Sequence, residues 1–390
     1  MKQTFASTHE QTGGPAYLDC NATAPIEPAV LDVMRDVWLY DYGNAGSRTH
    51  EYGLRAKKAV QKAREQVAAV VDAKPDEVIF TSGATESNNI AILGLAQHGN
   101  ATQRRHIIST AIEHKAVLEP LEHLQDQGFE VTLLRPGESG AVAPEDIEQA
   151  LRPDTLLVSV MHVNNETGIR QPIDAVAGLL EGHDAFFHVD AAQGYGKDIG
   201  PLCSKRIDLI SISSHKVYGP VGIGALVTRR RGFKRVPLTP LMFGGGQERG
   251  LRPGTLPVPL IVGLGLAAEM AETDHKERRA RCRAIREKAL AALKPLGIKL
   301  HGDPEKMMPH VLNFSIDGLD SEAVMVALKG LAAVSNGSAC TSQSYEPSHV
   351  LTAMDLPESQ VEGAVRVSWC HMTQDIEWES IVAALQRIIH

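Results

Sequence analysis

The sequence predicts an α/β protein with a mostly parallel sheet and a second, smaller α+β unit. Three observations predict this class. Short apolar runs alternate with helix-length segments from Tyr17 to about residue 250, which is typical of a parallel sheet covered by helices. A Gly- and Pro-rich stretch over 236–259 interrupts this alternation and indicates a functional loop and a unit boundary. A charged helical segment, 260–295, and mixed strands and helices follow it.

The chain length sets the expected organisation. With 390 residues the chain is long enough for two or three domains. We expect a large unit over 15–259, and a small unit formed by 1–14 and 260–390.

The elements follow in order along the chain. Residues 56–71 repeat apolar side chains at helical spacing with basic residues between them, and predict a helix. The β-rich runs predict strands and are EVIF (77–80), HIIST (106–110), FEVTLL (129–134), TLLVSVMHV (155–163), AFFHVDA (185–191), DLISISS (208–214) and GALVTRR (224–230). Two later runs, HVLNFSI (310–316) and AVRVSW (364–369), predict strands of the small unit.

Composition excludes several classes of protein. Apolar residues make up 43% and charged residues 22%, which rules out disordered and collagen-like chains. The net charge of −8 argues against direct nucleic-acid binding. Five scattered cysteines without a CxxC motif indicate neither a disulfide framework nor a zinc ribbon, and the histidines show no ligand spacing, so we expect no metal. No apolar run has the ~18–20 residues of a membrane span, and the first 14 residues lack a signal-peptide core, so we expect a cytoplasmic protein.

The segment TSGATES (81–87) follows a predicted strand and opens a predicted helix. Small and hydroxyl residues at such a turn leave backbone N–H groups free to hold an anion, and the helix dipole favours phosphate there. An ordinary turn capped by Ser or Thr explains this motif equally well.

Two further residues follow predicted strands. Asp190, in HVDAAQG (188–194), is placed to hold a protonated ring nitrogen or a metal, although an isolated Asp here more often caps the next helix. Lys216, in SISSHKVYGP (211–220), can form an imine with an aldehyde cofactor if its pocket is partly dry, although a lone lysine is usually solvated. The two lie 26 residues apart, which fits one βα unit and adjacent strand ends. With the anion-binding turn they predict a pyridoxal phosphate site.

Cys340 lies in a different setting from the other cysteines. Its neighbours in NGSACTSQSYEPSHVL (336–351) are small and polar, which predicts an exposed loop. Cys203, Cys282 and Cys370 fit the common role of a cysteine as a small buried apolar residue. An exposed thiol near an amino-acid-activating cofactor indicates a nucleophile.

The chain resembles the cysteine desulfurases of the NifS/IscS-like branch, which are class-V, fold-type I pyridoxal phosphate enzymes. The resemblance runs from YLDCNATAP (17–25) to RVSW (366–369). The motifs that carry it are GNAGSRTH (43–50), TSGATESNN (81–89), EHKAVL (113–118), MHVNNETG (161–168), HVDAAQ (188–193), SSHKVYGP (213–220), GGGQERGLRPGTLP (244–257) and NGSACTSQSYEPSHVL (336–351). It implies an aspartate aminotransferase-like fold with a seven-stranded sheet, and a catalytic-cysteine loop at about 333–347 in the small unit.

The resemblance also implies roles for individual residues. The catalytic residues it implies are Cys340, Lys216 and His114, with Lys216 as the Schiff-base lysine and His114 stacked on the ring. Around the cofactor it places Asp190 at the pyridinium nitrogen, Gln193 and Asn165 near the ring hydroxyl, and Ala84, Thr85, Ser213 and His215 at the phosphate. Thr255 resembles a threonine that reaches the phosphate of a partner subunit, which implies a homodimer, and Asn44 and Arg366 resemble the pair that grips the substrate carboxylate.

The reaction implied by the resemblance takes sulfur from L-cysteine. The products are L-alanine and a persulfide on Cys340, and an acceptor protein then takes the sulfur for iron–sulfur clusters, thio-modified tRNA or DNA phosphorothioation. The alternatives are a selenocysteine lyase or aminotransferase on the same cofactor, and a non-catalytic protein with the same fold. Cys340 argues against an aminotransferase, and Lys216, Asp190 and Cys340 together argue against a non-catalytic protein.

Some positions depart from the family pattern. Cys20 and Ala24 are unusual in the first motif, and Cys20 is a candidate second thiol near the site. Pro253 replaces a common Ser, and Trp369, Cys370 and His371 follow Arg366 in place of small and basic residues. The basic run RRRGFKR (229–235) is either a docking surface for an acidic acceptor or, more commonly for such runs, a solvated loop.

Overall fold

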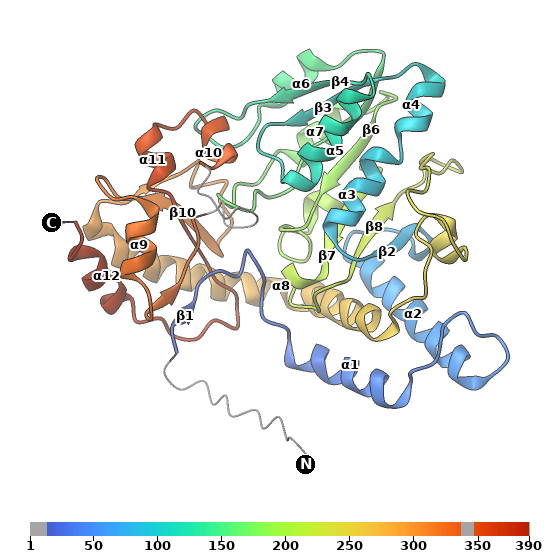
Figure 1. The fold of residues 1–390 in the computed structure, drawn as a ribbon, viewed down its shortest axis with the longest axis horizontal. Coiled ribbons are helices and arrows are strands. Elements are labelled where there is room, and N and C mark those ends of the chain that lie inside the picture. The colour runs from blue at the N-terminus through green and yellow to red at the C-terminus, as the bar shows by residue number, and fades with distance from the viewer. Residues whose placement is uncertain (1–13, 337–346, 390) are drawn as a thin grey trace.

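A seven-stranded sheet forms the centre of the larger part of the molecule. The structure is a computed structural model that describes residues 14–336 and 347–389. Within those residues the strand order is β2-β8-β7-β6-β5-β3-β4, and only β8 runs antiparallel to its neighbours. The strands are β2 (Val78–Thr81), β3 (His106–Thr110), β4 (Glu130–Leu134), β5 (Thr155–Ser159), β6 (Phe186–Asp190), β7 (Leu209–Ser213) and β8 (Gly224–Thr228). The predicted mostly parallel sheet is therefore confirmed (Figure 1).

Helices cover both faces of this sheet. They are α1 (Pro28–Tyr40), α2 (Glu51–Ala69), α3 (Ala84–Leu93), α4 (Ala96–Thr102), α5 (Lys115–Asp126), α6 (Pro144–Ala150), α7 (Ile173–Leu179) and α8 (Val258–Leu293). Successive strand residues face opposite sides, so Ile210 packs with α1, α2, α7 and α8 while Leu209 packs with α3 and α5. Because both faces are buried, the strands are continuous apolar runs, which is why the sequence shows them so clearly.

A second group of elements surrounds a small antiparallel sheet of order β12-β10-β9. Its strands are β9 (Lys299–Leu300), β10 (Val311–Ser315) and β12 (Val365–Ser368), and β1 (Ala16–Tyr17) pairs separately with β11 (Ala332–Ala333). The helices beside it are α9 (Ser321–Ala327), α10 (His349–Ala353), α11 (Glu358–Glu362) and α12 (Trp378–Gln386). The 3₁₀ helices of the chain are η1 (Pro75–Glu77), η2 (Gly200–Cys203), η3 (Ser214–Lys216), η4 (Gln247–Gly250) and η5 (Lys294–Leu296).

The long helix α8 joins the two groups. Its first half contributes Ile261 and Leu264 to the core under the large sheet. Its second half contributes Ala289 and Leu293 to the core around the small sheet. Figure 1 shows α8 running beneath both groups of elements. One continuous helix therefore fixes the two cores relative to each other.

The N-terminal segment returns to the C-terminal part of the chain. Besides the pairing of β1 with β11, Asp19 forms a parallel bridge with Ser368 directly after β12. Residues near 16–20 thus hydrogen-bond with strands of the 260–390 region, although the expected large unit begins at residue 15. The unit boundaries themselves stay a prediction.

Two features of the large sheet differ from the expectation. The connection from β6 to β7 contains only the short helix η2, where one βα unit was expected, and backbone hydrogen bonds from Gly194 and Tyr195 to Ala191 form a tight turn directly after Asp190. The strand β8 runs against β7, since the two are joined by a short turn instead of a helical crossover. Within the described residues, no helix is both long enough and apolar enough to cross a membrane.

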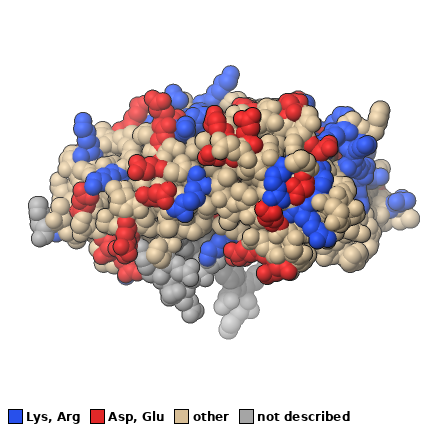
Figure 2. All heavy atoms as spheres, turned by 90° about the horizontal axis from the view of Figure 1, so that it is seen from above, with Lys and Arg blue, Asp and Glu red and all other residues tan. Residues whose placement is uncertain are grey.

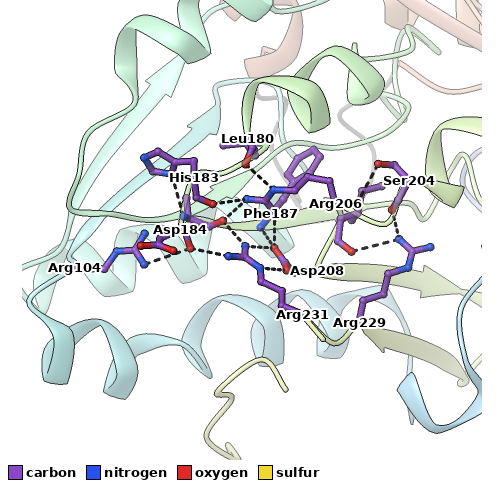
Figure 3. Close-up of polar contacts among 12 residues, drawn as sticks. Arg104, Leu180, His183, Asp184, Phe187, Ser204, Arg206, Asp208, Arg229 and Arg231 are labelled. Atoms are coloured by element: carbon purple, nitrogen blue, oxygen red, sulfur yellow. Dashed lines mark hydrogen bonds and ion pairs between the residues drawn. The ribbon is translucent and has the colours of Figure 1, made fainter. Parts of the chain in front are cut away.

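A buried carboxylate, Asp208, joins β6 and β7 at their N-terminal ends, which are the ends away from Asp190. Asp208 accepts hydrogen bonds from the Phe187 amide (2.7 Å), from Arg206 (2.9 Å) and from Arg231 (2.7 Å to each oxygen) (Figure 3). Arg229 is also buried and donates to the carbonyl oxygens of Ser204 and Leu202. This network holds the two strands in register.

The network also accounts for much of the basic run 229–235. Arg229 and Arg231 point into the fold, and Arg230 pairs with Asp76. Figure 2 shows acidic and basic side chains interspersed over most of one face, with Lys and Arg gathered toward one end. Most of the arginines in this run therefore stabilise the fold, which weakens its interpretation as a docking surface.

Candidate active site

Asp190 and Lys216 lie at the same edge of the large sheet. Asp190 is the last residue of β6, and Lys216 ends η3, which directly follows β7. The two strands are parallel neighbours with Asp190 opposite Ser211, so their carboxyl ends meet. The Lys216 Nζ atom donates to the carbonyl oxygens of Asn21 and Ala22, the latter at 2.7 Å. The lysine is thus only partly buried but is held in place, unlike a solvated surface lysine.

The carboxylate of Asp190 is held on both oxygens. Asn88 of α3 donates to Oδ2 at 2.7 Å, and the Ala192 amide donates to Oδ1 at 3.0 Å. The second contact is the local cap considered as the alternative role for this residue. Both contacts leave lone pairs available, so the carboxylate is oriented and still able to accept a further hydrogen bond.

His114 is the N-cap residue of α5. Its Nδ1 atom accepts from the Ala116 amide at 3.1 Å, so the proton of the neutral ring is assigned to Nε2. Burial, assisted by the nearby Lys216, lowers the pKa of His114 below its ordinary value. The ring is therefore neutral at pH 7 and is a planar surface beside the two charged residues.

The segment after β2 forms an open turn at the start of α3. Gly83 is the N-cap residue with φ 156°, a conformation that favours glycine, and no side chain caps this helix. A Cβ atom on Gly83 would lie 3.9 Å from Ser213 Oγ, and one on Gly224 would lie 2.6 Å from Gly83 Cα. The turn therefore packs against β8, with Gly83 near the Ser213 hydroxyl. No side chain caps α3, although the Thr81 hydroxyl accepts from the Gly83 amide at 3.4 Å within the turn.

His215 adjoins this turn and is uncharged at neutral pH. Its Nδ1 atom lies 3.2 Å from Thr23 Oγ1. Burial and the neighbouring Lys216 lower the pKa of His215 to about 4.

Gln193 carries a buried acceptor without a partner. Its Nε2 atom donates to the Asn21 carbonyl at 2.8 Å, whereas its Oε1 atom has no partner among the described residues. Asn165 lies next to it through Asn21, whose side chain donates to the Asn165 carbonyl at 3.1 Å. A buried acceptor without a donor is costly, so Oε1 is suited to a ligand hydroxyl.

Arg366 is a buried arginine on β12. It donates to Asp19 Oδ1 at 2.6 Å and to the Asn165 carbonyl at 3.1 Å, and its side chain is 3% exposed. Its Nε atom is buried with no partner among the described residues. A guanidinium group that is held by a carboxylate and whose Nε donor has no partner among the described residues is suited to a carboxylate ligand.

Cys340 lies outside the described residues, but both flanks of its segment are described. Before it, Ser335 forms an antiparallel bridge with Arg366, with 2.6 Å from the Arg366 amide to the Ser335 carbonyl. After it, Ser348 donates to Glu166 at 2.5 Å, and the His349 ring contacts the Glu113 carbonyl at 2.9 Å. The segment that carries Cys340 thus starts at the arginine just described and returns beside His114.

Two of the predicted residues, Asn44 and Thr255, are exposed on loops. Asn44 is exposed in the connection between α1 and α2, where its side chain accepts from the Gly46 amide at 2.8 Å. Thr255 is exposed in the loop before α8. Figure 1 places the connection between α1 and α2 at the opposite end of the molecule from the small sheet, so one chain does not bring Asn44 to Arg366. Their proposed roles stay predictions.

Some site residues were not assigned from the sequence. Asp19 and Asn21 lie in YLDCNATAP, and Asn88 lies in TSGATESNN, so the motifs included them without indicating their contacts. Glu113 is buried, and burial raises its pKa to about 8. Its position beside His114 in EHKAVL is the only signal that the sequence offers.

The donor set fits pyridoxal phosphate. A lysine, an oriented carboxylate, an uncapped helix N-terminus with a hydroxyl, and an unsatisfied buried acceptor surround one region at the sheet edge. Among the described residues there is no group of three or more His, Cys, Asp or Glu side chains that could hold a metal ion.

Comparison with known proteins agrees with this site. Residues 16–379 match the family model described as aminotransferase class-V. A cysteine desulfurase IscS of Vibrio vulnificus is 44% identical over 377 residues, which are 96% of this chain and 92% of that protein. Among solved structures, DndA from Streptomyces lividans is 54% identical with a TM-score of 0.80, covering 91% of this chain and 99% of that one. A structure described as SspA in complex with cysteine is 37% identical, also with a TM-score of 0.80, over 90% of this chain and 98% of that one.

The expected family is thereby confirmed: the chain belongs to the class-V aminotransferase family and, within it, to the cysteine desulfurases, which depend on pyridoxal phosphate.

Proposed function

We propose that the residues described above carry out the desulfurase reaction, in which L-cysteine and the Cys340 thiol give L-alanine and a Cys340 persulfide. The observation that carries this assignment is the convergence of Asp190, Lys216 and Arg366 with both flanks of the segment that contains Cys340. The solved SspA complex, which contains cysteine, supports cysteine as the substrate.

Five groups of contacts would hold the cofactor. Lys216 would bind its aldehyde, Asp190 would pair with the ring nitrogen, and His114 would stack on the ring. Gln193 Oε1 would accept from the ring hydroxyl, with Asn165 adjacent. The amides of Ala84 and Thr85, with Ser213 and His215, would hold the phosphate. When bound, this cofactor withdraws electrons from the α-carbon of the amino acid.

Arg366 orients the substrate by its carboxylate. The carboxylate of Asp19 and the Asn165 carbonyl fix the guanidinium plane, and Nε remains as a donor. A substrate carboxylate therefore meets a preorganised donor and does not have to order a mobile side chain.

Lys216 and Cys340 move the proton and the sulfur. Lys216 would take the α-proton of the substrate. The Cys340 thiolate attacks the substrate sulfur, so a sulfur–sulfur bond forms and the bond from the substrate sulfur to its Cβ breaks. The Cβ atom then takes a proton to give alanine, and no outside oxidant or reductant is required.

The working form is proposed to be a homodimer. Seven exposed apolar residues lie on α1, its connection to α2 and the start of α2, and we call this the α1–α2 apolar surface; they are Leu31, Trp38, Leu39, Tyr40, Tyr42, Tyr52 and Leu54. Their exposed fractions of 44–68% are unusual for such large side chains clustered together. Asn44 lies within this surface, so a second copy on it would give Asn44 access to a site that it does not reach in its own chain. Thr255 is proposed to reach the phosphate of that second copy.

Further parts of the proposal concern organisation, partners and location. We retain a large unit over 15–259 and a small unit over 1–14 and 260–390, with the catalytic loop at about 333–347. The sulfur passes to an acceptor protein, with no direct nucleic-acid or membrane contact. A cytoplasmic location is supported by Cys20, Cys203, Cys282 and Cys370, which are all free thiols.

The test measures alanine and persulfide formation from L-cysteine by the holoenzyme. We expect the wild type to form both, and Lys216→Ala and Cys340→Ala to lose both. Cys340→Ala should keep the visible absorbance of the bound cofactor, since none of the proposed cofactor contacts involves this thiol. Cys203→Ser, at a half-buried thiol far from the sheet edge, is the matched control and should keep both products.

Two results would contradict the proposal. Alanine release that persists in Cys340→Ala would assign the sulfur step to another thiol or to a simple lyase. A cofactor-bound wild type that makes no alanine would favour a different amino acid or a non-catalytic role.

A further inference from the structure

Two buried cysteines outside the proposed site lie in contact with each other. Cys20 follows β1 and Cys370 follows β12, and they are 2% and 1% exposed. They share one small cluster with Ala24 and Tyr218, and each thiol is close enough to shift the pKa of the other. Neither thiol has a part in the proposed reaction.

The backbone imposes this contact. Asp19 bridges Ser368 in parallel, the Cys20 amide donates to the Ser368 carbonyl at 3.2 Å, and the Ser368 amide donates to the Leu18 carbonyl at 2.8 Å. Two segments from opposite ends of the sequence therefore lie side by side and hydrogen-bond to each other at this point. The two sulfur atoms are placed by a hydrogen-bonded ladder and not by mobile side chains.

The surroundings of the two thiols differ. The Cys370 sulfur accepts a hydrogen bond from the Thr373 hydroxyl at 3.7 Å, and the Lys197 ammonium group is near. The neighbouring Cys20 thiol, with those other contacts, lowers the pKa of Cys370. The neighbouring Cys370 thiol and burial raise the pKa of Cys20. Cys370 is thus the nucleophilic member of the pair, and Cys20 is the proton donor.

A small cavity lies beside Tyr218, which is a neighbour of the pair. It has a volume of about 20 Å³ and its wall includes Lys197, Tyr218 and Cys282. Tyr218 also belongs to the cluster around the two thiols, so its ring lies between the cluster and the cavity, which neither thiol lines. Its size suits one water-sized molecule and excludes a protein or peptide thiol.

We propose that Cys20 and Cys370 are a redox-active pair that a hydroperoxide oxidises to a disulfide. The Cys370 thiolate attacks the peroxide, its oxygen–oxygen bond breaks, and hydroxide leaves with Cys370 as the sulfenic acid. The Cys20 sulfur then attacks Cys370, the sulfur–oxygen bond breaks, and the proton of Cys20 and the released hydroxide end in water. Two thiols and one hydrogen peroxide thus give one disulfide and two waters.

The position of the pair connects it to the proposed site. Cys20 lies between Asp19, which holds Arg366, and Asn21, whose carbonyl accepts from Lys216 and Gln193. The disulfide joins this segment covalently to the strand that carries Arg366. Because it closes a loop of almost the whole chain, the oxidised protein should unfold at a midpoint temperature a few degrees higher than the reduced protein.

The experiment maps the cysteines after oxidation. Reduced holoenzyme is treated with hydrogen peroxide, denatured in N-ethylmaleimide, digested and examined by mass spectrometry. The wild type and Cys340→Ser are compared, so that the loop thiol cannot supply an exchange partner. We expect a linked peptide pair joining Cys20 and Cys370 in both proteins, reversed by dithiothreitol, and the rise in midpoint temperature.

Matched variants separate the pair from its neighbours. Cys282→Ser removes a buried thiol beside the same cavity and should keep the linked peptides, whereas Cys20→Ser and Cys370→Ser should lose them together with the temperature shift. Maleimide on both Cys20 and Cys370 after peroxide treatment would overturn the proposal. A linkage of either residue to Cys282 or Cys340, or sulfinic acid on Cys370 without linkage, would also overturn it.

Discussion

The side chain of Arg366 is held in one orientation by its neighbours. Two of its donor groups are used by Asp19 and the Asn165 carbonyl, and its backbone is bonded to Ser335. The remaining Nε donor has no alternative partner among the described residues. The side chain loses its conformational freedom during folding, so the proposed binding of substrate does not carry that entropic cost.

Arg366→Lys keeps the positive charge and removes the planar fork. We expect kcat/KM for L-cysteine to fall about 10- to 100-fold, because a hydrogen bond to a charged group contributes about 1.5–3 kcal/mol. Initial rates of alanine release over a range of cysteine concentrations measure this loss. Arg135→Lys is the control, since Arg135 is exposed and paired with Asp355; an equal loss in both variants would contradict the assigned role.

Glu113 makes the stability of the protein depend on pH. Burial raises its pKa to about 8 in the folded state, whereas an unfolded glutamate ionises near its ordinary value of 4.5. Between these two values the unfolded chain releases the proton and the folded chain keeps it, so the free energy of unfolding falls as pH rises through this window.

Glu113→Gln should remove this contribution. Its carbonyl oxygen can still accept from Thr110 and the Met161 amide, as Oε1 of the acid does at 2.8 Å. We expect the stability of the wild type, relative to the variant, to decrease by up to about 1.4 kcal/mol per pH unit between pH 4.5 and 8. Urea unfolding at several pH values measures it, and parallel curves for the two proteins would show that Glu113 stays ionised.

At the scale of elements, the strands of the large sheet were predictable and their directions were only partly so. Both faces of β3, β5, β6 and β7 are buried, so each strand is a short apolar run with polar boundaries. The direction of β8 was not predictable, because a buried antiparallel strand after β7 has the same apolar sequence pattern as a buried parallel strand. The two-residue strands β1 and β11 show no pattern, since they exist only through their pairing across the chain.

The same distinction applies to the site. Asp190 and Lys216 were predictable because the carboxyl ends of parallel strands meet, which is a property of the element. The contacts of Lys216 with the carbonyls of Asn21 and Ala22, and of Asn88 with Asp190, join distant parts of the sequence. Every residue has a backbone carbonyl, so no sequence motif can mark the ones that Lys216 contacts. These contacts could be identified only from the folded structure.

Asp208 joins β6 to β7 through the Phe187 amide, and Figure 3 shows its contacts with Arg206 and Arg231. Asp208→Asn removes the charge between Arg206 and Arg231 and should lower the free energy of unfolding by about 3 kcal/mol, because a buried ion pair then lacks one partner. Urea unfolding followed by circular dichroism measures the change. Asp154→Asn, in a solvent-exposed pair with Arg152, should change stability by less than about 1 kcal/mol; equal losses would contradict the role of burial.

At the scale of the whole molecule, the α1–α2 apolar surface is the feature that a single chain leaves unexplained. Trp38→Glu places a charge within this surface and should convert the proposed dimer into a monomer, since charged residues are disfavoured at the centre of an interface. Light scattering coupled to size exclusion measures the mass. Val326→Glu, at a residue of α9 that is 73% exposed, is the control and should keep the dimer mass. A Trp38→Glu protein that remains dimeric would place the interface elsewhere.

The pairing of the first strand with the last part of the chain has a consequence for the order of synthesis. A growing polypeptide contains β6, β7 and Lys216 long before Arg366 has been translated. Until then Asp19 has no guanidinium partner, and β1 has no β11 beside it. These contacts join segments that are separated by most of the sequence. Closing such a long loop has a high entropic cost, so contacts of this kind form slowly. The half of the site that would take the cofactor can therefore assemble on the ribosome, whereas the half that would select the substrate is completed only after the chain is almost finished.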